Sequence, residues 1–337
     1  MNSLSATSVH YDLNKFTYIL DKITSAEFCQ EPFKHIEIFD FLSEEHFNSI
    51  ITSSQVAIPK ANDSKSLIDT LFDKDYEIIR FPGCANSVNH YLNWLEDKSV
   101  YKNPTKPCEG MGMALRLKNP QDKILLELKN FFASDIFKKA LEDKFDITRP
   151  TAMDTGLQKY LYGYEISPHP DIRKKALTYM LNVNPSDNSE DLDIHTHYLT
   201  FKPHKQFIGE FWHHNENIDT CWVPWEWCNT VKKQCRNNSI VIFAPSWDTL
   251  HAIKANYDHL QTQRTQFYGN LWYKDISRMP KVYYYQFDIK PVIRPGSKPQ
   301  VRTPKSMVKS WVKKLLPHRG HNKSDRQAVQ IFPQDYD

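Results

Sequence analysis

A succession of short strand-like segments fills the second half of the chain and restricts its fold more than any other feature. The segments are rich in β-branched and aromatic side chains, and turns containing Pro, Asn, Asp or Ser separate them. The expected strands are residues 156–166, 176–183, 195–201, 239–243, 250–255, 265–273 and 283–289. Many short strands in a row predict two packed sheets or a closed barrel, because each strand must bury an apolar face.

Helical periodicity dominates the first half of the chain. Apolar residues recur at helical spacing across residues 121–145, which predicts one or two amphipathic helices there. A strand is expected at residues 33–41, and Ser43 followed by two glutamates is typical of a helix start, so residues 46–51 should be helical. Both halves together predict a β-rich α+β fold, in which N-terminal helices support a β-domain.

The C-terminal part of the chain differs in charge from the rest. Residues 291–337 carry ten Lys and Arg against three Asp, a net charge of +7, so the remaining body carries −4 of the total of +3. Within this tail, residues 306–316 form an amphipathic pattern that predicts a short helix. We expect residues 1–290 to form one domain, with helical support in 1–150 and the β-barrel core in 151–290. A basic extension follows it.

Composition excludes several classes of protein. Aromatic residues make up 13% of the chain, too many for a disordered protein, and no apolar run approaches the roughly 18 residues of a membrane span. The first ten residues lack the basic and apolar regions of a secretion signal, so we expect a cytoplasmic protein whose six cysteines stay reduced. The mildly acidic body argues against a nucleic-acid partner. We expect a small-molecule substrate, and the sequence predicts no oligomeric state.

The sharpest chemical signal is His169-Pro170-Asp171, which lies between two expected strands. An imidazole and a carboxylate two positions apart at a strand end can point to the same side and bind one metal. His251, in a later expected strand, is the candidate for the third ligand. Two histidines and one carboxylate leave one face of an octahedral Fe(II) open for a cosubstrate and O₂.

Arg264 adds a fourth element to this pattern. It lies 13 residues after His251, at the start of the expected strand 265–273. A guanidinium in that place can bind a carboxylate through two parallel hydrogen bonds, which a lysine does less well. A His-x-Asp sequence alone occurs by chance in many proteins, but its combination with the later His and Arg is specific.

On these residues the chain resembles the 2-oxoglutarate/Fe(II)-dependent oxygenases. Residues 158–182 resemble the first metal-ligand region of that family and residues 238–272 the second, within a likeness that covers about residues 150–275. The resemblance implies a double-stranded β-helix, or jelly-roll barrel. It also implies that His169, Asp171 and His251 bind Fe(II), that Arg264 binds the distal carboxylate of 2-oxoglutarate, and that O₂ is consumed.

One position departs from the pattern of the family. Many members that act on small molecules have a serine two residues after the arginine, as a second partner of the cosubstrate carboxylate, and this chain has Gln266 there. Another residue must then complete the cosubstrate site, and Tyr160 and Thr178 are the candidates.

The expected substrate is a small, carboxylated metabolite, because the inserts 185–194 and 204–234 can enclose a pocket. Arg173, Arg116 and Trp225 are the candidate substrate residues. The stretch from His195 to Trp272 is also similar to kainoid synthases, which oxidatively cyclise a prenylated amino acid. The resemblance therefore leaves hydroxylation and ring closure open. The alternatives are a prolyl-type hydroxylase of protein side chains and a metal-binding β-barrel that serves as a scaffold.

Two further histidine pairs have competing interpretations. His195 and His197 imitate the His-x-His pair of cupins, but no Glu follows at the required distance, so we expect them outside the metal site. His213 and His214 lie in an aromatic stretch, residues 207–227. That stretch is either a loop packed on the barrel or a lid that keeps water from the substrate.

Overall fold

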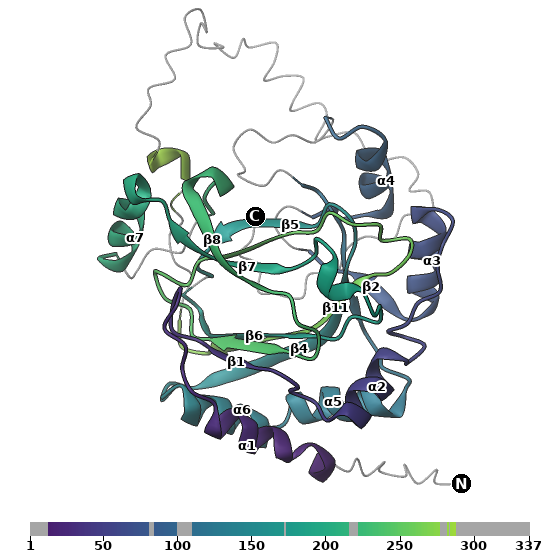
Figure 1. Ribbon diagram of the computed structural model, residues 1–337, viewed down its shortest axis with the longest axis horizontal. Coiled ribbons are helices and arrows are strands. Elements are labelled where there is room, and N and C mark those ends of the chain that lie inside the picture. Colours follow the sequence, from purple (N-terminus) through teal and green to yellow (C-terminus); the bar gives the residue numbers. More distant parts are fainter. Residues whose placement is uncertain are drawn as a thin grey trace, which may run out of the picture.

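The computed structural model describes residues 13–80, 84–99, 110–171, 173–215, 222–276, 282 and 284–287. Two antiparallel sheets form its centre and are stacked as two layers (Figure 1). The larger sheet contains β1 (Ile36–Ile38), β9 (Ile240–Phe243), β6 (Lys175–Asn182), β11 (Arg264–Tyr273), β4 (Thr151–Tyr160), β3 (Ala114–Leu117) and β2 (Tyr76–Ile78), in this spatial order. The smaller sheet contains β5 (Glu165–His169), β10 (His251–Lys254), β7 (Thr196–Phe201) and β8 (Cys228–Gln234), also in spatial order. The predicted β-rich class is confirmed.

The chain alternates between the two sheets from β4 onward. β4, β6, β9 and β11 belong to the larger sheet, β5, β7, β8 and β10 to the smaller one, and only β7 and β8 follow each other within a sheet. The predicted single strand 156–166 is therefore wrong, because β4 and β5 lie in different sheets. The chain turns between them at Gly163, whose φ of 77° suits a residue without a Cβ. A Cβ at Gly163 would also overlap the ring of Trp94.

The two faces of the larger sheet have opposite character. Directly opposed residues of antiparallel strands share a face, and β11 pairs along its length with β4 and, over most of it, with β6. One face carries Leu157, Leu177, Phe267 and Leu271, which belong to the main hydrophobic core. The other face carries Tyr160, Met180, Arg264, Gln266 and Tyr268, which line a cavity shared with the smaller sheet.

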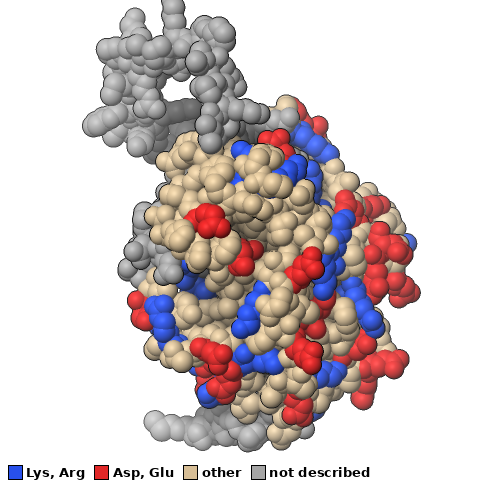
Figure 2. All heavy atoms as spheres, turned by 60° about the vertical axis from the view of Figure 1, so that its left-hand side comes forward, with Lys and Arg blue, Asp and Glu red and all other residues tan. Residues whose placement is uncertain are grey.

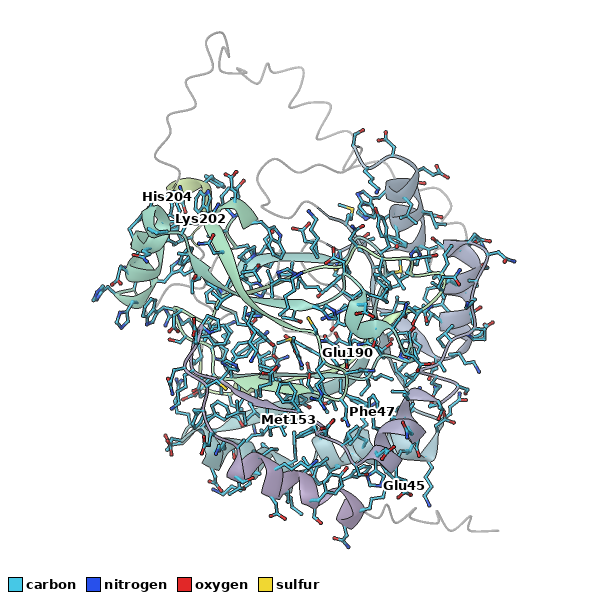
Figure 3. All side chains as sticks on the ribbon, in the orientation of Figure 1. Glu45, Phe47, Met153, Glu190, Lys202 and His204 are labelled. Atoms are coloured by element: carbon cyan, nitrogen blue, oxygen red, sulfur yellow. The ribbon has the colours of Figure 1, made fainter. Side chains whose placement is uncertain are left out.

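Helices cover the apolar face of the larger sheet. α1 (Tyr18–Ser25), α2 (Glu44–Ile51), α5 (Lys123–Phe132) and α6 (Asp135–Lys144) lie below it in Figure 1. α3 (Ser64–Asp73) lies at the right-hand side of the molecule and α4 (Val88–Glu96) at the upper right. Phe47 of α2 and Met153 of β4, both labelled in Figure 3, pack against this core. α7 (Gln206–His213) lies on the opposite side of the molecule, where Lys202 and His204 mark the approach from β7.

Side-chain caps explain where several helices begin. The Ser43 hydroxyl accepts a hydrogen bond from the His46 N–H, so α2 starts where the sequence predicted. The helical pattern of residues 121–145 forms two helices, because Ser134 caps the second by accepting from the Phe137 N–H.

Other expectations for the elements need correction. β8, an edge strand with an exposed polar face, was not expected from the sequence, and neither were the short strands β2 and β3 that extend the larger sheet. A strand was expected at residues 283–289, but Tyr284–Phe287 forms a 3-10 helix and the flanking residues lie outside the described part. The basic extension 291–337, with its expected helix at 306–316, also lies outside the described residues.

Within the described residues, no helix is both long and apolar enough to cross a membrane. Figure 2 presents a face on which basic and acidic side chains are interspersed.

Lys159 of β4 is a fully buried lysine on the helical side of the larger sheet. Its Nζ donates to the carbonyl of Val56 at 2.7 Å and to the hydroxyl of Thr265 at 2.8 Å. Burial lowers the pKa of Lys159 to about 7. Between pH 7 and the ordinary lysine pKa, the unfolded chain therefore holds a proton at this side chain that the folded chain has released.

This difference predicts a stability that rises with pH. Since the unfolded state binds more protons above pH 7, the free energy of unfolding of the wild type should increase relative to that of Lys159→Met by about 1 kcal/mol per pH unit. Urea denaturation at pH 7.5, 8.5 and 9.5 measures this difference. Lys123→Met, at a side chain that is 85% exposed, is the control and should give a constant difference. A constant difference for Lys159→Met would contradict the proton release.

Candidate metal centre

Three potential metal ligands meet where β5 ends and β10 begins. His169 is the last residue of β5, His251 is the first residue of β10, and the two are directly paired between the strands. Their ring centroids are 4.3 Å apart. Asp171 follows in a left-handed conformation, with φ of 69°, and its carboxylate oxygens lie 3.7 Å from Nε2 of His169 and 3.9 Å from Nε2 of His251.

Backbone hydrogen bonds orient both imidazoles. Nδ1 of His169 lies 2.8 Å from the carbonyl oxygen of Ser167, and Nδ1 of His251 lies 2.9 Å from that of Thr249. A carbonyl can only accept, so each Nδ1 carries the proton and each Nε2 presents a lone pair. Both lone pairs face Asp171, which is the arrangement that a metal requires of its histidine ligands.

The electrostatics favour the ligand forms of these side chains. Burial, together with the neighbouring His169, lowers the pKa of His251 to about 3, so its imidazole is neutral at physiological pH. Burial alone would raise the pKa of Asp171. The ammonium of Lys175 is the main group that opposes burial, and the pKa of Asp171 lies well below its usual range.

Two residues of β6 hold the Asp171 carboxylate in place. The buried Lys175 ammonium donates to one carboxylate oxygen at 2.7 Å, and the Thr178 hydroxyl donates to the other at 2.6 Å. Lys175 also lies 2.9 Å from the hydroxyl of Tyr268 on β11. Because both oxygens are fixed, the carboxylate has one orientation toward the histidines.

The three side chains fit a divalent cation. Two ligands in neighbouring positions on one ion are about 3 Å apart when each bond is about 2.1 Å. The distances of 3.7 and 3.9 Å are somewhat longer, so small side-chain rotations close them onto an ion. Two neutral imidazoles and one carboxylate on one side of the ion form the donor set of non-haem Fe(II) sites, with the other coordination positions open.

A cavity between the sheets connects this centre to Arg264. His169 and His251 line it, and Arg264 lines it from the first position of β11. The Arg264 guanidinium is buried, lies 4.5 Å from the centroid of the Tyr160 ring and donates to the Thr196 hydroxyl at 3.1 Å. Among the described residues, no carboxylate pairs with it. A buried cation without an anion is unfavourable, so this guanidinium is suited to an anionic ligand that enters the cavity.

The remaining residues singled out in the sequence have different surroundings. Tyr160 lines the cavity beside Arg264, and its hydroxyl donates to Gln158. Thr178 instead hydrogen-bonds to Asp171 and is not among the cavity-lining residues. Gln266 lines the cavity and donates to Asn182.

The three candidate substrate residues lie in three different segments. Arg116 lies on β3 and pairs with Asp154 at 2.7 Å. Arg173 donates to the carbonyl of Trp212 and so connects the segment after Asp171 to α7. Trp225 donates its indole N–H to Glu165 of β5 at 2.8 Å. Another tryptophan, Trp222, packs edge-on against His169 with ring centroids 6.2 Å apart.

The two other histidine pairs lie apart from this centre. His195 binds the carbonyl of Glu190, and His197 lies 2.9 Å from the Thr230 hydroxyl, as expected for residues outside the metal site. His213 and His214 form an exposed group with Glu210 at the end of α7, where His213 stacks on Trp247.

Comparisons with known proteins give only remote likeness. No protein-family model and no curated protein matches the chain. Among solved structures, it is similar to a Trichoplax adhaerens prolyl hydroxylase in complex with a hypoxia inducible factor oxygen degradation domain peptide fragment. The identity is 10% and the TM-score 0.36, over 77% of this chain and 89% of the other. A Pseudomonas putida prolyl-4-hydroxylase gives 9% identity and a TM-score of 0.38, over 76% and 98%. At this distance, the activity has to be inferred from the chain's own site.

Lys175 is the residue at this centre that the sequence analysis missed. It lies four positions after Asp171, in a stretch with several basic residues. Nothing in the sequence pattern separates it from its half-buried neighbours Arg173 and Lys174. Which of these lysines faces the Asp171 carboxylate depends on where β6 begins, and β6 begins at Lys175.

The hydrogen bonds that hold the Asp171 carboxylate lead to a prediction about metal affinity. Thr178→Val keeps the shape of the side chain but removes the hydrogen bond to Asp171, so the dissociation constant for Co(II) or Fe(II) should rise about 10- to 100-fold. Anaerobic metal titration measures it. Thr155→Val is the control, since the Thr155 hydroxyl binds Tyr179 instead. Equal affinities in the two variants would show that Thr178 does not position the ligand.

Proposed function

We propose that the protein is an Fe(II)- and 2-oxoglutarate-dependent dioxygenase that oxidises a C–H bond of a small, carboxylated metabolite. One observation supports this most directly. A single cavity is lined by His169 and His251, the two histidines of the group that also contains Asp171, and by the buried guanidinium of Arg264, which has no carboxylate partner among the described residues. A ligand that joins the two must offer a metal-binding group and a carboxylate, and 2-oxoglutarate has both.

The strand order supports a double-stranded β-helix for residues 151–273. Eight strands, β4 to β11, lie in the orders β9–β6–β11–β4 and β5–β10–β7–β8, which is the arrangement of a jelly roll with two four-stranded sheets. β1, β3 and β2 extend the first of these sheets at its two edges. We further propose that residues 1–290 form one domain with this barrel as its core.

The roles of the residues follow from their contacts. His169, Asp171 and His251 would hold Fe(II) through Nε2 and carboxylate oxygens. Bound Fe(II) with 2-oxoglutarate supplies the activation of O₂ that C–H oxidation requires. Arg264 would bind the distal carboxylate of 2-oxoglutarate, with the Tyr160 ring against the guanidinium.

Other side chains keep the site ready for this chemistry. Lys175 and Thr178 hold Asp171 ionised and in one orientation. Trp222 covers one side of His169 with an apolar ring, which limits the access of water to the ligand.

The type of oxidation, the cellular location and the redox state of the cysteines stay predictions. Hydroxylation and ring closure of the kainoid type use the same residues and differ in where the substrate radical lies. A prolyl-type hydroxylase is the second candidate, and a metal-binding scaffold is the third. We also propose a cytoplasmic location and reduced cysteines.

The proposed metal and cosubstrate can be tested together. Anaerobic addition of Fe(II) and then 2-oxoglutarate to the apo-protein should produce a visible metal-to-ligand charge-transfer band. His169→Ala should abolish the band because it removes one of the three ligands. His197→Ala is the matched control and should retain it, since His197 binds Thr230 away from the centre. Folded, iron-loaded protein without a band would exclude the oxygenase and favour the scaffold.

The role of Arg264 has its own prediction. Arg264→Met should raise the 2-oxoglutarate concentration for half-maximal band intensity at least ~10-fold, because the carboxylate loses a charged two-point partner. Arg149→Met removes an exposed arginine that pairs with Asp275 and should leave this concentration unchanged. If the two variants titrate alike, Arg264 is not part of the cosubstrate site.

A further inference from the structure

The cavity face of the larger sheet carries a second polar site, one strand beyond the cosubstrate residues. Directly opposed residues of neighbouring strands form rows across the sheet, and two such rows make up this site. Arg116 of β3 opposes Gln158 of β4, which opposes the cavity residue Gln266 of β11. Directly opposed residues share a face, so all three side chains lie on the side that faces the smaller sheet.

A second row connects this site to the metal centre. Asp154 of β4 opposes Asn270 of β11, and Asn270 opposes Thr178 of β6. The Thr178 hydroxyl lies 2.6 Å from Asp171 and 3.1 Å from the Asn270 side-chain oxygen. The row therefore ends on the metal ligand.

Arg116 joins the two rows. Its Nη2 donates to one oxygen of Asp154 at 2.7 Å. To do so, the side chain crosses β4 above Gly156, where a Cβ would overlap the guanidinium. Gly156 opposes Tyr268, which lines the cavity, so the Arg116–Asp154 pair lies next to the cavity wall.

Three buried polar atoms around the Arg116–Asp154 pair have no hydrogen-bond partner in the described structure. They are Nη1 of Arg116, the second carboxylate oxygen of Asp154 and Nε2 of Gln158, and Nδ2 of Asn270, in the row toward Thr178, is a fourth such atom. A buried polar atom without a partner costs about 1–3 kcal/mol, and three of them on one sheet face need an explanation. Water can satisfy them in the free protein, and a ligand that displaces this water must reproduce its hydrogen bonds.

The chemistry of the three atoms specifies the ligand. Arg116 and Gln158 offer two donors, one of them charged, which suits the two oxygens of a carboxylate. Asp154 offers a charged acceptor, which suits an ammonium. We infer that this site binds the head group of a free α-amino acid, and that an amino acid is the substrate class of the proposed oxygenase.

The distance from this site to the metal centre can be spanned by an amino-acid side chain. Two strand spacings separate β4 from β6, which is about 10 Å across the sheet. Tyr268 of β11 lies between them and opposes Met180 of β6, and both side chains line the cavity. A side chain that extends from the head group along these two residues leads toward Asp171.

Three ligands with the same hydrocarbon stem test this inference. L-norleucine has the complete head group, hexanoate has the carboxylate only, and pentylamine has the ammonium only. The full-length, metal-free chain is used, because a free amino acid can chelate a bound metal. Ligand-observed NMR titration should give L-norleucine a dissociation constant at least ~10-fold lower than that of either partial ligand, since each lacks one charged hydrogen-bonded group.

Asp154→Asn is the decisive variant. It keeps the oxygen that accepts from Arg116 and replaces the free oxygen by an amide donor, so it should remove the preference of L-norleucine over hexanoate. Arg116→Lys keeps a charge beside Asp154 but removes the second guanidinium donor, and it should weaken L-norleucine and hexanoate alike by about 10-fold. Thermal unfolding confirms that both variants fold.

Arg264→Met separates this site from the cosubstrate site. It should leave L-norleucine binding unchanged. If Arg264→Met abolishes binding and Arg116→Lys does not, the amino acid occupies the cosubstrate end and the inference is wrong. Equal affinity for the three ligands, or no binding, would mean that the three atoms bind water only.

This inference rests on the proposed function for its link to substrate, but the two can fail separately. Loss of the charge-transfer band with intact L-norleucine selectivity rejects the oxygenase and keeps an amino-acid site. A normal band without selectivity rejects the amino-acid site and keeps the oxygenase.

Discussion

The pairing of β11 with β4 on one side and β6 on the other is the interaction on which the rest of the structure depends. Ten residues of β11 pair with β4, from Arg264 opposite Tyr160 to Tyr273 opposite Thr151. This register sends Phe267 and Leu271 to the helices and sends Arg264, Gln266 and Tyr268 to the cavity. A shift by one residue would exchange the two sets, burying polar side chains in the core and exposing apolar ones to the cavity. The faces on which the functional side chains of β4, β6 and β11 lie therefore depend on these two registers.

Most strands from β4 to β11 were predicted from the sequence more accurately than the breaks between them. The apolar pattern of residues 156–166 continues through the turn at Gly163, so periodicity alone could not show that β4 and β5 belong to different sheets. β8 was missed because an edge strand with one solvent-facing side, such as Cys228–Gln234, has the composition of a loop. Both errors concern the arrangement of sheets, which is decided by contacts between distant segments.

The residues of the candidate site differ in the same way. Some can be recognised from the local sequence, and others only from their contacts with distant strands. The pairing of β5 with β10 brings His169 and His251 together, and both residues stand out in the sequence because their type and spacing suit a metal. Lys175, Asp154 and Gln158 do not stand out, because their importance comes from the strands beside them. Arg116 was singled out as a possible substrate residue, but its pairing with Asp154 across Gly156 could only be found in the structure.

The hydrogen bonds that orient His169 and His251 both end on backbone carbonyls, two positions earlier in the chain. The side chains at Ser167 and Thr249 are not used in these bonds. The tautomer of either imidazole therefore depends on the path of the backbone and not directly on the side chain two positions earlier. At Thr249 the side chain still holds that path, because its hydroxyl accepts from the Ser246 N–H at 3.1 Å and lies 2.9 Å from the carbonyl oxygen of Pro170, between His169 and Asp171. A substitution at Thr249 would therefore act on the two imidazoles and the carboxylate through the backbone that places them.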